Sequence, residues 1–178
     1  WTNELIPNKF KDLTNDHPRM VIPFRDADNK VFAYQGRAFG KEKPKYITIV
    51  LDQESEKIFG LDRVDNNRNI IIVEGPIDSL FLPNCIAVAQ GDLRLPQYKG
   101  KSTLVFDNEP RNREIVKNIE KAVAEDYSVV IWPKYVKEKD INDMIVGGKT
   151  NLEILNIIHK NTFSGLEAKT QLSHWKKV

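Results

Sequence analysis

Four short runs of mainly apolar residues constrain the fold of this chain more than any other feature. The first is Ile70–Val73, and the others lie within residues 85–89, 102–106 and 128–132. Runs of this length without polar alternation are typical of strands that are buried on both faces of a sheet. Between the last two runs, residues 111–125 carry apolar side chains at helical spacing. Strands that alternate with helices predict an α/β fold with a mainly parallel sheet flanked by helices.

The first 60 residues have a different pattern. The β-rich runs "RMVIPF" and "KVFAYQGR" flank the turn-forming stretch "RDADNK", which predicts a β-hairpin, and "KYITIVL" predicts a further strand. Pro76 suits the first position of a short helix. We expect further helices over residues 141–147, 151–160 and 163–174. The chain is therefore divided into a β-rich subdomain (1–66), an α/β domain (67–148) and a C-terminal helical segment (149–178).

Composition narrows the class of protein. The chain has 178 residues, of which 40% are apolar and 29% charged, and this is typical of a globular protein. No apolar run approaches the roughly 20 residues that span a bilayer, so we expect no membrane association. The single cysteine, Cys85, excludes an internal disulfide and a cysteine-rich zinc site in this chain and suggests a reducing cytoplasm. Because the chain starts at Trp1, we expect a fragment of a longer polypeptide.

Charge is concentrated in one segment. The net charge of +2 is too small to indicate nucleic-acid binding, but residues 30–45 contain five basic residues and one acidic residue. Aromatic residues are interspersed among these bases. Such a segment suits a surface that contacts phosphates, although a solvated hairpin face would have the same composition.

Acidic residues follow three of the four apolar runs. Glu74 and Asp78 follow the first run, Asp107 and Glu109 follow the third, and Asp140 and Asp143 come after the fourth. Because ligands of open parallel sheets bind at the carboxyl ends of the strands, we expect these side chains to meet at one edge. Crowded carboxylates favour a hard divalent cation, so the pattern predicts a site for Mg²⁺ or Mn²⁺, with two or more ions.

Each acid also has a simpler explanation when it is taken alone. Asp78 could stabilise the first turn of a helix, and Asp107 and Asp140 could cap helices. The coincidence of three acid clusters at three strand ends favours the metal site over these separate explanations.

The stretches "VEGPIDSL", "VFDNEP" and "KDIND" resemble, in this order, the motifs of the Toprim domain, which DnaG-type primases, topoisomerases and small nucleases share. This chain has Asp-x-Glu where Asp-x-Asp is usual. The preceding segment, with "QGR", "PKYIT" and "IFG", is similar to the basic segment in front of Toprim in DnaG-type primases. Within residues 17–147, "EGPIDSLF", "DNEPR" and "KDINDMI" look most like the primases of T-even-type bacteriophages.

The resemblance implies a DNA primase catalytic core that synthesises short RNA primers on single-stranded DNA by metal-dependent nucleotidyl transfer. It implies a Toprim fold preceded by a β-rich basic subdomain and followed by a helical tail. Matching positions give catalytic roles to Glu74, Asp107 and Glu109. The implied metal ligands are Glu74, Asp78, Asp107, Glu109, Asp140 and Asp143. Template and nucleotide contacts fall on Arg19, Arg37, Lys45 and Tyr46, although Tyr46 could equally pack in the core.

The implied partners are a single-stranded DNA template, ribonucleoside triphosphates and a replicative helicase. Primases of this type usually carry a zinc-binding domain, whose ligands we do not find in this chain, so we expect no zinc here. A Toprim nuclease would use the same acids, and a non-catalytic helicase- or DNA-binding module is a further alternative. A type IA topoisomerase is disfavoured because no tyrosine-bearing cleavage domain is present.

Overall fold

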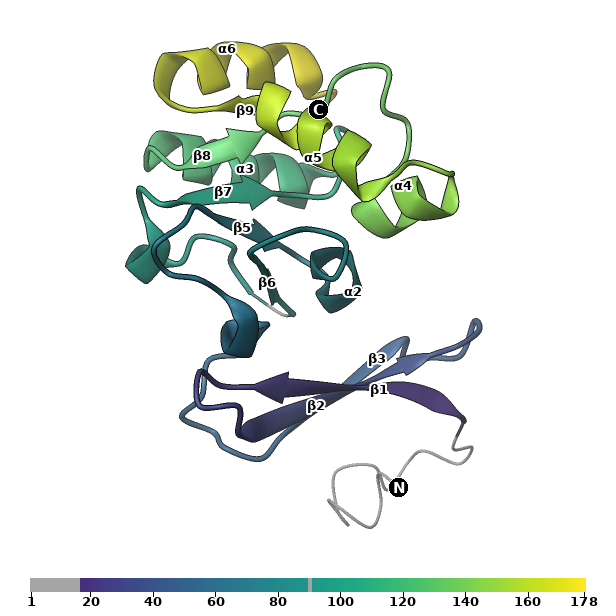
Figure 1. Cartoon of the computed structure of the whole chain (residues 1–178). Coiled ribbons are helices and arrows are strands. Elements are labelled where there is room, and N and C mark those ends of the chain that lie inside the picture. The colour runs from purple at the N-terminus through teal and green to yellow at the C-terminus, as the bar shows by residue number, and fades with distance from the viewer. Residues whose placement is uncertain (1–16, 90) are drawn as a thin grey trace.

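The computed structural model describes residues 17–89 and 91–178, which form two β-sheets and the helices around them (Figure 1). The part of the predicted β-rich subdomain that falls in residues 1–16 lies outside the described residues. The division of the chain at residues 66 and 148 stays a prediction.

The smaller sheet is antiparallel and contains β1 (Arg19–Arg25), β2 (Val31–Ala38) and β3 (Tyr46–Val50), in that order. The predicted hairpin is confirmed as β1 and β2. In its turn the Asp26 carboxylate accepts hydrogen bonds from the backbone N–H groups of Asp28 and Lys30, at 3.0 and 2.9 Å. Because the Asp26 side chain accepts these backbone hydrogen bonds, it stabilises the turn, and the strand ends at this polar stretch.

The larger sheet has the order β4-β6-β5-β7-β8-β9. Its four central strands are parallel, and both edge strands run antiparallel to their neighbours. Every residue of β5, β6 and β7 is buried, as the apolar runs predicted. The strands are β4 (Ile58–Phe59), β5 (Ile70–Val73), β6 (Cys85–Val88), β7 (Ser102–Val105), β8 (Ser128–Val130) and β9 (Thr162–Phe163).

Five α-helices accompany the larger sheet within the described residues. In Figure 1, α3 and α6 contact each other on one side, whereas α2, α4 and α5 follow one another on the other side. Within the described part of the chain, no helix is both long and apolar enough to cross a membrane. The helices are α2 (Pro76–Ser79), α3 (Arg113–Ala124), α4 (Ile141–Val146), α5 (Asn151–Lys160) and α6 (Gly165–Trp175), with 3₁₀ turns η1 (Leu61–Arg63) and η2 (Pro96–Tyr98).

Two details of the helix prediction were wrong. The last helix begins at Gly165 rather than at residue 163, because Thr162 and Phe163 pair with β8 as the edge strand β9. The helix predicted from residue 111 begins at Arg113, because the Asn112 side chain caps it by accepting from the backbone N–H of Glu114. Asp107 therefore does not cap this helix.

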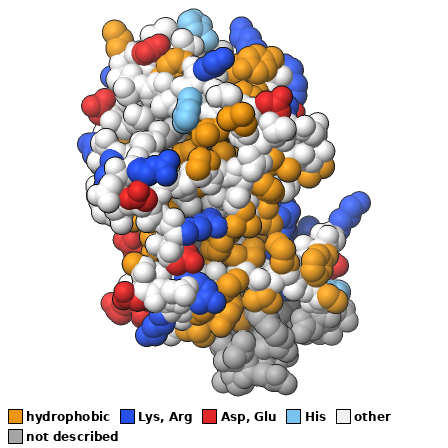
Figure 2. All heavy atoms as spheres, in the orientation of Figure 1, with side chains coloured by type: hydrophobic (Ala, Val, Ile, Leu, Met, Phe, Trp, Pro, Cys, Tyr) orange, Lys and Arg blue, Asp and Glu red, His pale blue; other side chains and the backbone are white. Residues whose placement is uncertain are grey.

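A small aromatic core joins the two sheets. Phe24 of β1 is fully buried, and its ring lies 6.1 Å from that of Phe32 and 5.4 Å from that of Phe59. Beside this core, β1 and α2 line an apolar cavity of about 410 Å³, and Figure 2 shows hydrophobic side chains gathered over the middle of this face. This packing fixes the position of the smaller sheet against the strand ends of the larger one.

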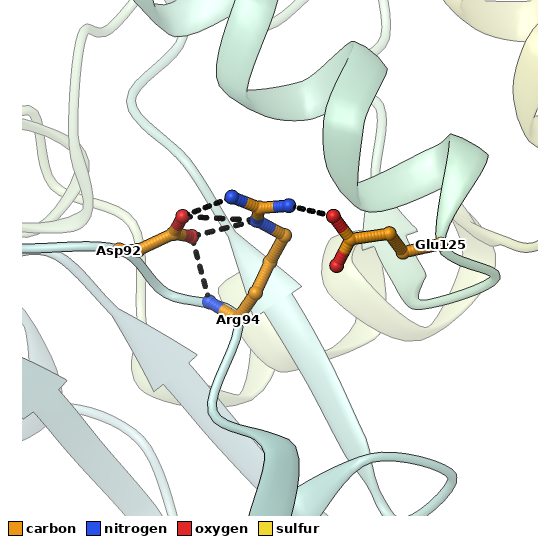
Figure 3. Close-up of polar contacts among 3 residues, drawn as sticks. All are labelled: Asp92, Arg94 and Glu125. Carbon is orange, nitrogen blue, oxygen red and sulfur yellow. Dashed lines mark hydrogen bonds and ion pairs between the residues drawn. The ribbon is translucent and has the colours of Figure 1, made fainter.

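Arg94 connects the loop before β7 to the end of α3. Its guanidinium pairs with the carboxylates of Asp92 and Glu125 (Figure 3). The Arg94 side chain is only 15% exposed, but the side chains of Asp92 and Glu125 are 44% and 50% exposed, so solvent screens this pairing as it does other surface ion pairs.

Thr150 provides a test of how the C-terminal helices are stabilised. Its hydroxyl accepts from the backbone N–H of Glu153, and the Glu153 carboxylate accepts from the backbone N–H of Thr150, which completes a capping box on α5. We expect Thr150→Ala to lower the free energy of unfolding by about 1 kcal/mol in urea titration. Thr150→Ser is the control and should retain most of the stability. Equal losses in both variants would show that the hydroxyl cap is not the cause.

Candidate active site

A cleft of about 390 Å³ opens where β5, β6 and β7 end and faces the smaller sheet. Strand ends of the larger sheet supply its acidic wall, and Gln35, Lys45 and Tyr46 of the smaller sheet form the opposite wall. Six of the predicted site residues line this cleft: Lys45, Tyr46, Glu74, Asp78, Asp107 and Asp140.

Glu74 stands directly after β5 and links two strand ends. Its carboxylate accepts a hydrogen bond of 3.2 Å from the backbone N–H of Asp107, which follows β7. Next to it, Gly75 leaves room for the Asp78 carboxylate, since a Cβ atom there would lie 2.2 Å from one of its oxygens and the carboxylate would have to move. Pro76 then begins α2 at its first position, as predicted. The Glu-Gly-Pro sequence thus turns the chain sharply and leaves the Glu74 carboxylate at the cleft.

Asp78 and Asp140 both contact the N-terminal turn of α4. Asp78 accepts from the backbone N–H of Asn142 at 2.8 Å, and Asp140 caps the helix by accepting from the backbone N–H of Asp143 at 2.7 Å. The simpler explanation of Asp140 as a helix cap is therefore confirmed. Asp78 lies in the first turn of α2, as its own simpler explanation expected, and it also contacts α4, so it ties α2 to α4 while it lines the cleft.

Lys139 brings Asp107 and Glu109 together. Its ammonium nitrogen lies 3.3 Å from a carboxylate oxygen of each. Both acids of the "DNE" stretch therefore face one positive charge. Lys139 was not singled out from the sequence, where its only signal is its place directly before Asp140 in "KDIND".

Burial and mutual repulsion disturb the protonation of these acids. Burial raises the pKa of Glu74 to about 7, and the neighbouring Asp107 charge adds to this. Burial also raises the pKa of Asp78 to about 6, reinforced by Asp140 and Asp107, and raises that of Asp107 although Lys139 opposes it. Burial disfavours protonation of Lys139, but Asp107 and Glu109 outweigh it and raise the pKa of the ammonium group. The ionised forms of these carboxyl groups are therefore disfavoured in the cleft, and an added cation would favour them.

The predicted six-residue metal site is not assembled in this arrangement. Within residues 17–89 and 91–178, no three Asp, Glu, His or Cys side chains are grouped so that they could hold a metal ion. The Lys139 ammonium lies between Asp107 and Glu109, and Asp78 and Asp140 are engaged by α4. The donors nevertheless fit Mg²⁺ or Mn²⁺, because they are carboxylates and Lys139 already stands in for a cation between two of them.

The other predicted residues lie in different places. Asp143 is exposed on α4 and is not among the residues that line the cleft. Arg19 packs along Gly36 and donates a hydrogen bond of 2.8 Å to the carbonyl of Pro44, so it supports the connection before β3. The Arg37 guanidinium lies 5.9 Å from the centre of the Tyr46 ring.

Tyr46 is 39% exposed, which rules out the alternative in which it is a core residue. The Lys45 ammonium lies 5.5 Å from the centre of its ring, which also contacts Arg37. Opposite the acids, the cleft therefore has an aromatic ring flanked by two cations, an arrangement suited to a base and its phosphates. Gln35 is a lining residue that the sequence analysis missed, and its only signal was its place in the "QGR" stretch.

The raised pKa of Glu74 predicts a pH-dependent penalty on stability. In the unfolded chain Glu74 ionises near its ordinary pKa of 4.5, whereas in the folded chain it keeps its proton up to about pH 7. Stability therefore falls as pH rises between these values. In EDTA, we expect the stability gain of Glu74→Gln over wild type to grow between pH 4.5 and pH 8, by up to about 3 kcal/mol. A gain that does not change with pH in urea titrations would contradict the buried, crowded environment of this carboxyl.

Comparison with known proteins supports the resemblance. The DNA primase of Enterobacteria phage T4 is 40% identical over 99% of this chain, which spans 52% of that primase. Among solved structures, the RNA polymerase domain of Mycobacterium tuberculosis primase DnaG has a TM-score of 0.63 at 18% identity, covering 83% of this chain and 57% of that one. A DnaG primase catalytic domain bound to ssDNA has a TM-score of 0.59 at 18% identity, covering 81% and 52%.

The phage relative and the solved structures are all primases or primase domains, but their sequence identity to this chain differs. No protein-family model matches the chain. The solved structures, at these low identities, show that the fold is shared, and the phage relative extends the agreement to sequence along nearly the whole chain. The chain spans about half the length of this phage relative. This chain is therefore similar in sequence to a phage DNA primase along nearly its whole length, and it shares the fold of primase catalytic domains.

Proposed function

We propose that this chain synthesises RNA primers on single-stranded DNA in the cleft between its two sheets. The observation that carries this proposal is that carboxylates from two strand ends, Glu74 and Asp107, share one cleft with Lys45 and Tyr46 of the smaller sheet. Acids alone would suit any Toprim enzyme. An opposing wall with a cation and an exposed aromatic ring suits an enzyme that must hold a template and an incoming nucleotide.

In the reaction, the 3′-oxygen of one ribonucleotide bonds to the α-phosphorus of the next, and the bond to pyrophosphate breaks. We assign Glu74 the role of accepting the hydroxyl proton, because its carboxylate stands directly after β5 and lines the cleft. Lys45 and Arg37 would attract the phosphates, and Tyr46 would stack on a base.

Glu74, Asp107 and Glu109 would hold Mg²⁺ or Mn²⁺, with Asp78 and Asp140 beside them. A bound divalent ion would lower the pKa of the hydroxyl and neutralise charge on the triphosphate. For the ion to contact Asp107 and Glu109, the Lys139 ammonium group would have to move away from the two carboxylates. Asp143 contributes least, since it is exposed outside the cleft.

The proposed partners follow from the same assignment. The template is single-stranded DNA and the substrates are ribonucleoside triphosphates. A replicative helicase as partner rests on the family resemblance alone. The reaction would take place in the cytoplasm, of a bacterial host if the chain is encoded by a phage.

The test is an extension assay on a short RNA annealed to a DNA template, in which RNA and DNA carry different labels. An annealed RNA supplies the 3′-hydroxyl, so the assay does not depend on recognition of a start site. With ribonucleotides and Mg²⁺ or Mn²⁺, we expect the RNA to lengthen while the DNA stays intact. Metal-dependent shortening of the DNA without RNA growth would favour a nuclease. Tight template binding without either reaction would favour a non-catalytic module.

A further inference from the structure

Asn108, between Asp107 and Glu109, connects the "DNE" stretch to the loop that carries Lys139. Its backbone N–H donates to the carbonyl of Lys139 at 2.7 Å. Its side-chain amide donates to the carbonyls of Val136 and Glu138, both at 3.1 Å. Three hydrogen bonds from one residue thus hold residues 136–139 against the strand end that carries two of the acids.

The fourth hydrogen bond of Asn108 comes from the C-terminal helix. The indole N–H of Trp175, the last residue of α6, donates to the side-chain oxygen of Asn108 at 3.2 Å. This bond also fixes the orientation of the amide, because a flipped amide would present its NH₂ group to the indole N–H and lose both carbonyl partners. Trp175 therefore holds the Asn108 amide in the orientation in which it donates to the carbonyls of Val136 and Glu138.

Helix α6 is well placed to hold this contact. Trp175 is only 9% exposed and belongs to the core of the larger sheet. Just beyond it, the backbone N–H of Lys177 donates to the carbonyl of Pro110 at 2.8 Å. The chain directly after the indole is thereby attached to the segment that follows β7.

From these contacts we infer that Asn108, oriented by Trp175, is a positioning residue for the acidic cleft. It sets the place of Lys139 and Asp140 relative to Asp107 and Glu109, and so the spacing of the carboxylates that would receive a divalent ion. The inference rests on the proposed function only for the identity of the reaction. It assigns the C-terminal helix a part in organising the cleft.

The experiment compares Trp175→Phe and Asn108→Ala with wild type. Phenylalanine keeps an aromatic ring in the core but removes the N–H donor, so the variant is expected to fold even if Asn108→Ala does not. Lys176→Ala is the matched control, because it removes an ion pair of the same helix that does not touch Asn108. Mn²⁺ affinity is measured by calorimetry, and kcat and KM are measured separately in the RNA extension assay.

We expect Mn²⁺ to bind about tenfold more weakly to Asn108→Ala and about threefold more weakly to Trp175→Phe, as for other residues that orient metal ligands. The value of kcat should fall while KM for the template stays unchanged, and Lys176→Ala should match wild type. Unchanged Mn²⁺ affinity and kcat in Trp175→Phe would overturn the inference, as would an equal loss in Lys176→Ala or a wild-type chain that does not bind Mn²⁺. A wild type that binds Mn²⁺ but extends no RNA would overturn the proposed function alone, provided that Trp175→Phe still binds more weakly.

Discussion

Replacing Glu74 with glutamine is expected to reduce ribonucleotide addition by about a thousandfold or more, within the range for loss of a general base. The amide keeps the shape of the side chain and can still accept the hydrogen bond from the backbone of Asp107. It cannot accept a proton from the attacking hydroxyl, and it removes one negative charge from the cleft. Single-nucleotide extension of an annealed RNA, measured at saturating template, reports this loss directly.

The control for this variant is Glu114→Gln, which makes the same change on the exposed first turn of α3. It should extend RNA at the wild-type rate. Template affinity should also be similar in all three proteins, because the proposed DNA contacts lie on the opposite wall. A Glu74→Gln variant with more than about a tenth of the wild-type rate would exclude Glu74 as the essential base.

The second large effect concerns Asp107 and Asp143, two acids that the sequence analysis both assigned as metal ligands. Asp107→Asn should weaken Mn²⁺ binding and slow RNA extension by about a hundredfold, at the upper end of what is found when metal sites lose a supporting group. Asp143→Asn should change both by no more than about twofold, since Asp143 is exposed on α4 and offers only its backbone N–H to Asp140. Calorimetry with Mn²⁺ and the extension assay together measure this contrast.

Equal losses in Asp107→Asn and Asp143→Asn would show that the ions bind closer to α4 than the cleft geometry indicates. Asp107→Asn also weakens the link to Lys139, so its thermal stability must be measured alongside. A lower melting temperature with unchanged Mn²⁺ affinity would give Asp107 a structural role only.

The buried strands could be predicted because burial on both faces leaves continuous apolar runs in the sequence. The run Ile70–Val73 is fully buried in β5. In the hairpin, the Asp26 side chain itself accepts a hydrogen bond from the turn backbone, so the turn residues could be recognised in the sequence. The edge strands β4 and β9 could not be predicted in this way. Each has two residues, which is too short for alternation, and both are defined by pairing with partners distant in the chain.

The acids of the cleft were found because they follow strands whose carboxyl ends share an edge. Their partners were harder to predict, because hydrogen bonds between distant segments leave no pattern in the sequence. Lys139 contacts Asp107 and Glu109 although it lies 30 residues after Glu109 in the chain. Trp175 contacts Asn108 across a separation of 67 residues. Arg19, which the family resemblance assigned to the DNA groove, also donates to the carbonyl of Pro44 and so supports the β2–β3 connection.

The most direct test of the account is to locate Mn²⁺ in crystals of this chain from its anomalous scattering. We expect the ion in the cleft, with carboxylate oxygens of Glu74 and Asp107 among its ligands and with the Lys139 ammonium displaced from its place between Asp107 and Glu109. Mn²⁺ bound elsewhere, with Lys139 still bridging the two acids, would contradict the proposal that this cleft is a metal-dependent site of RNA synthesis.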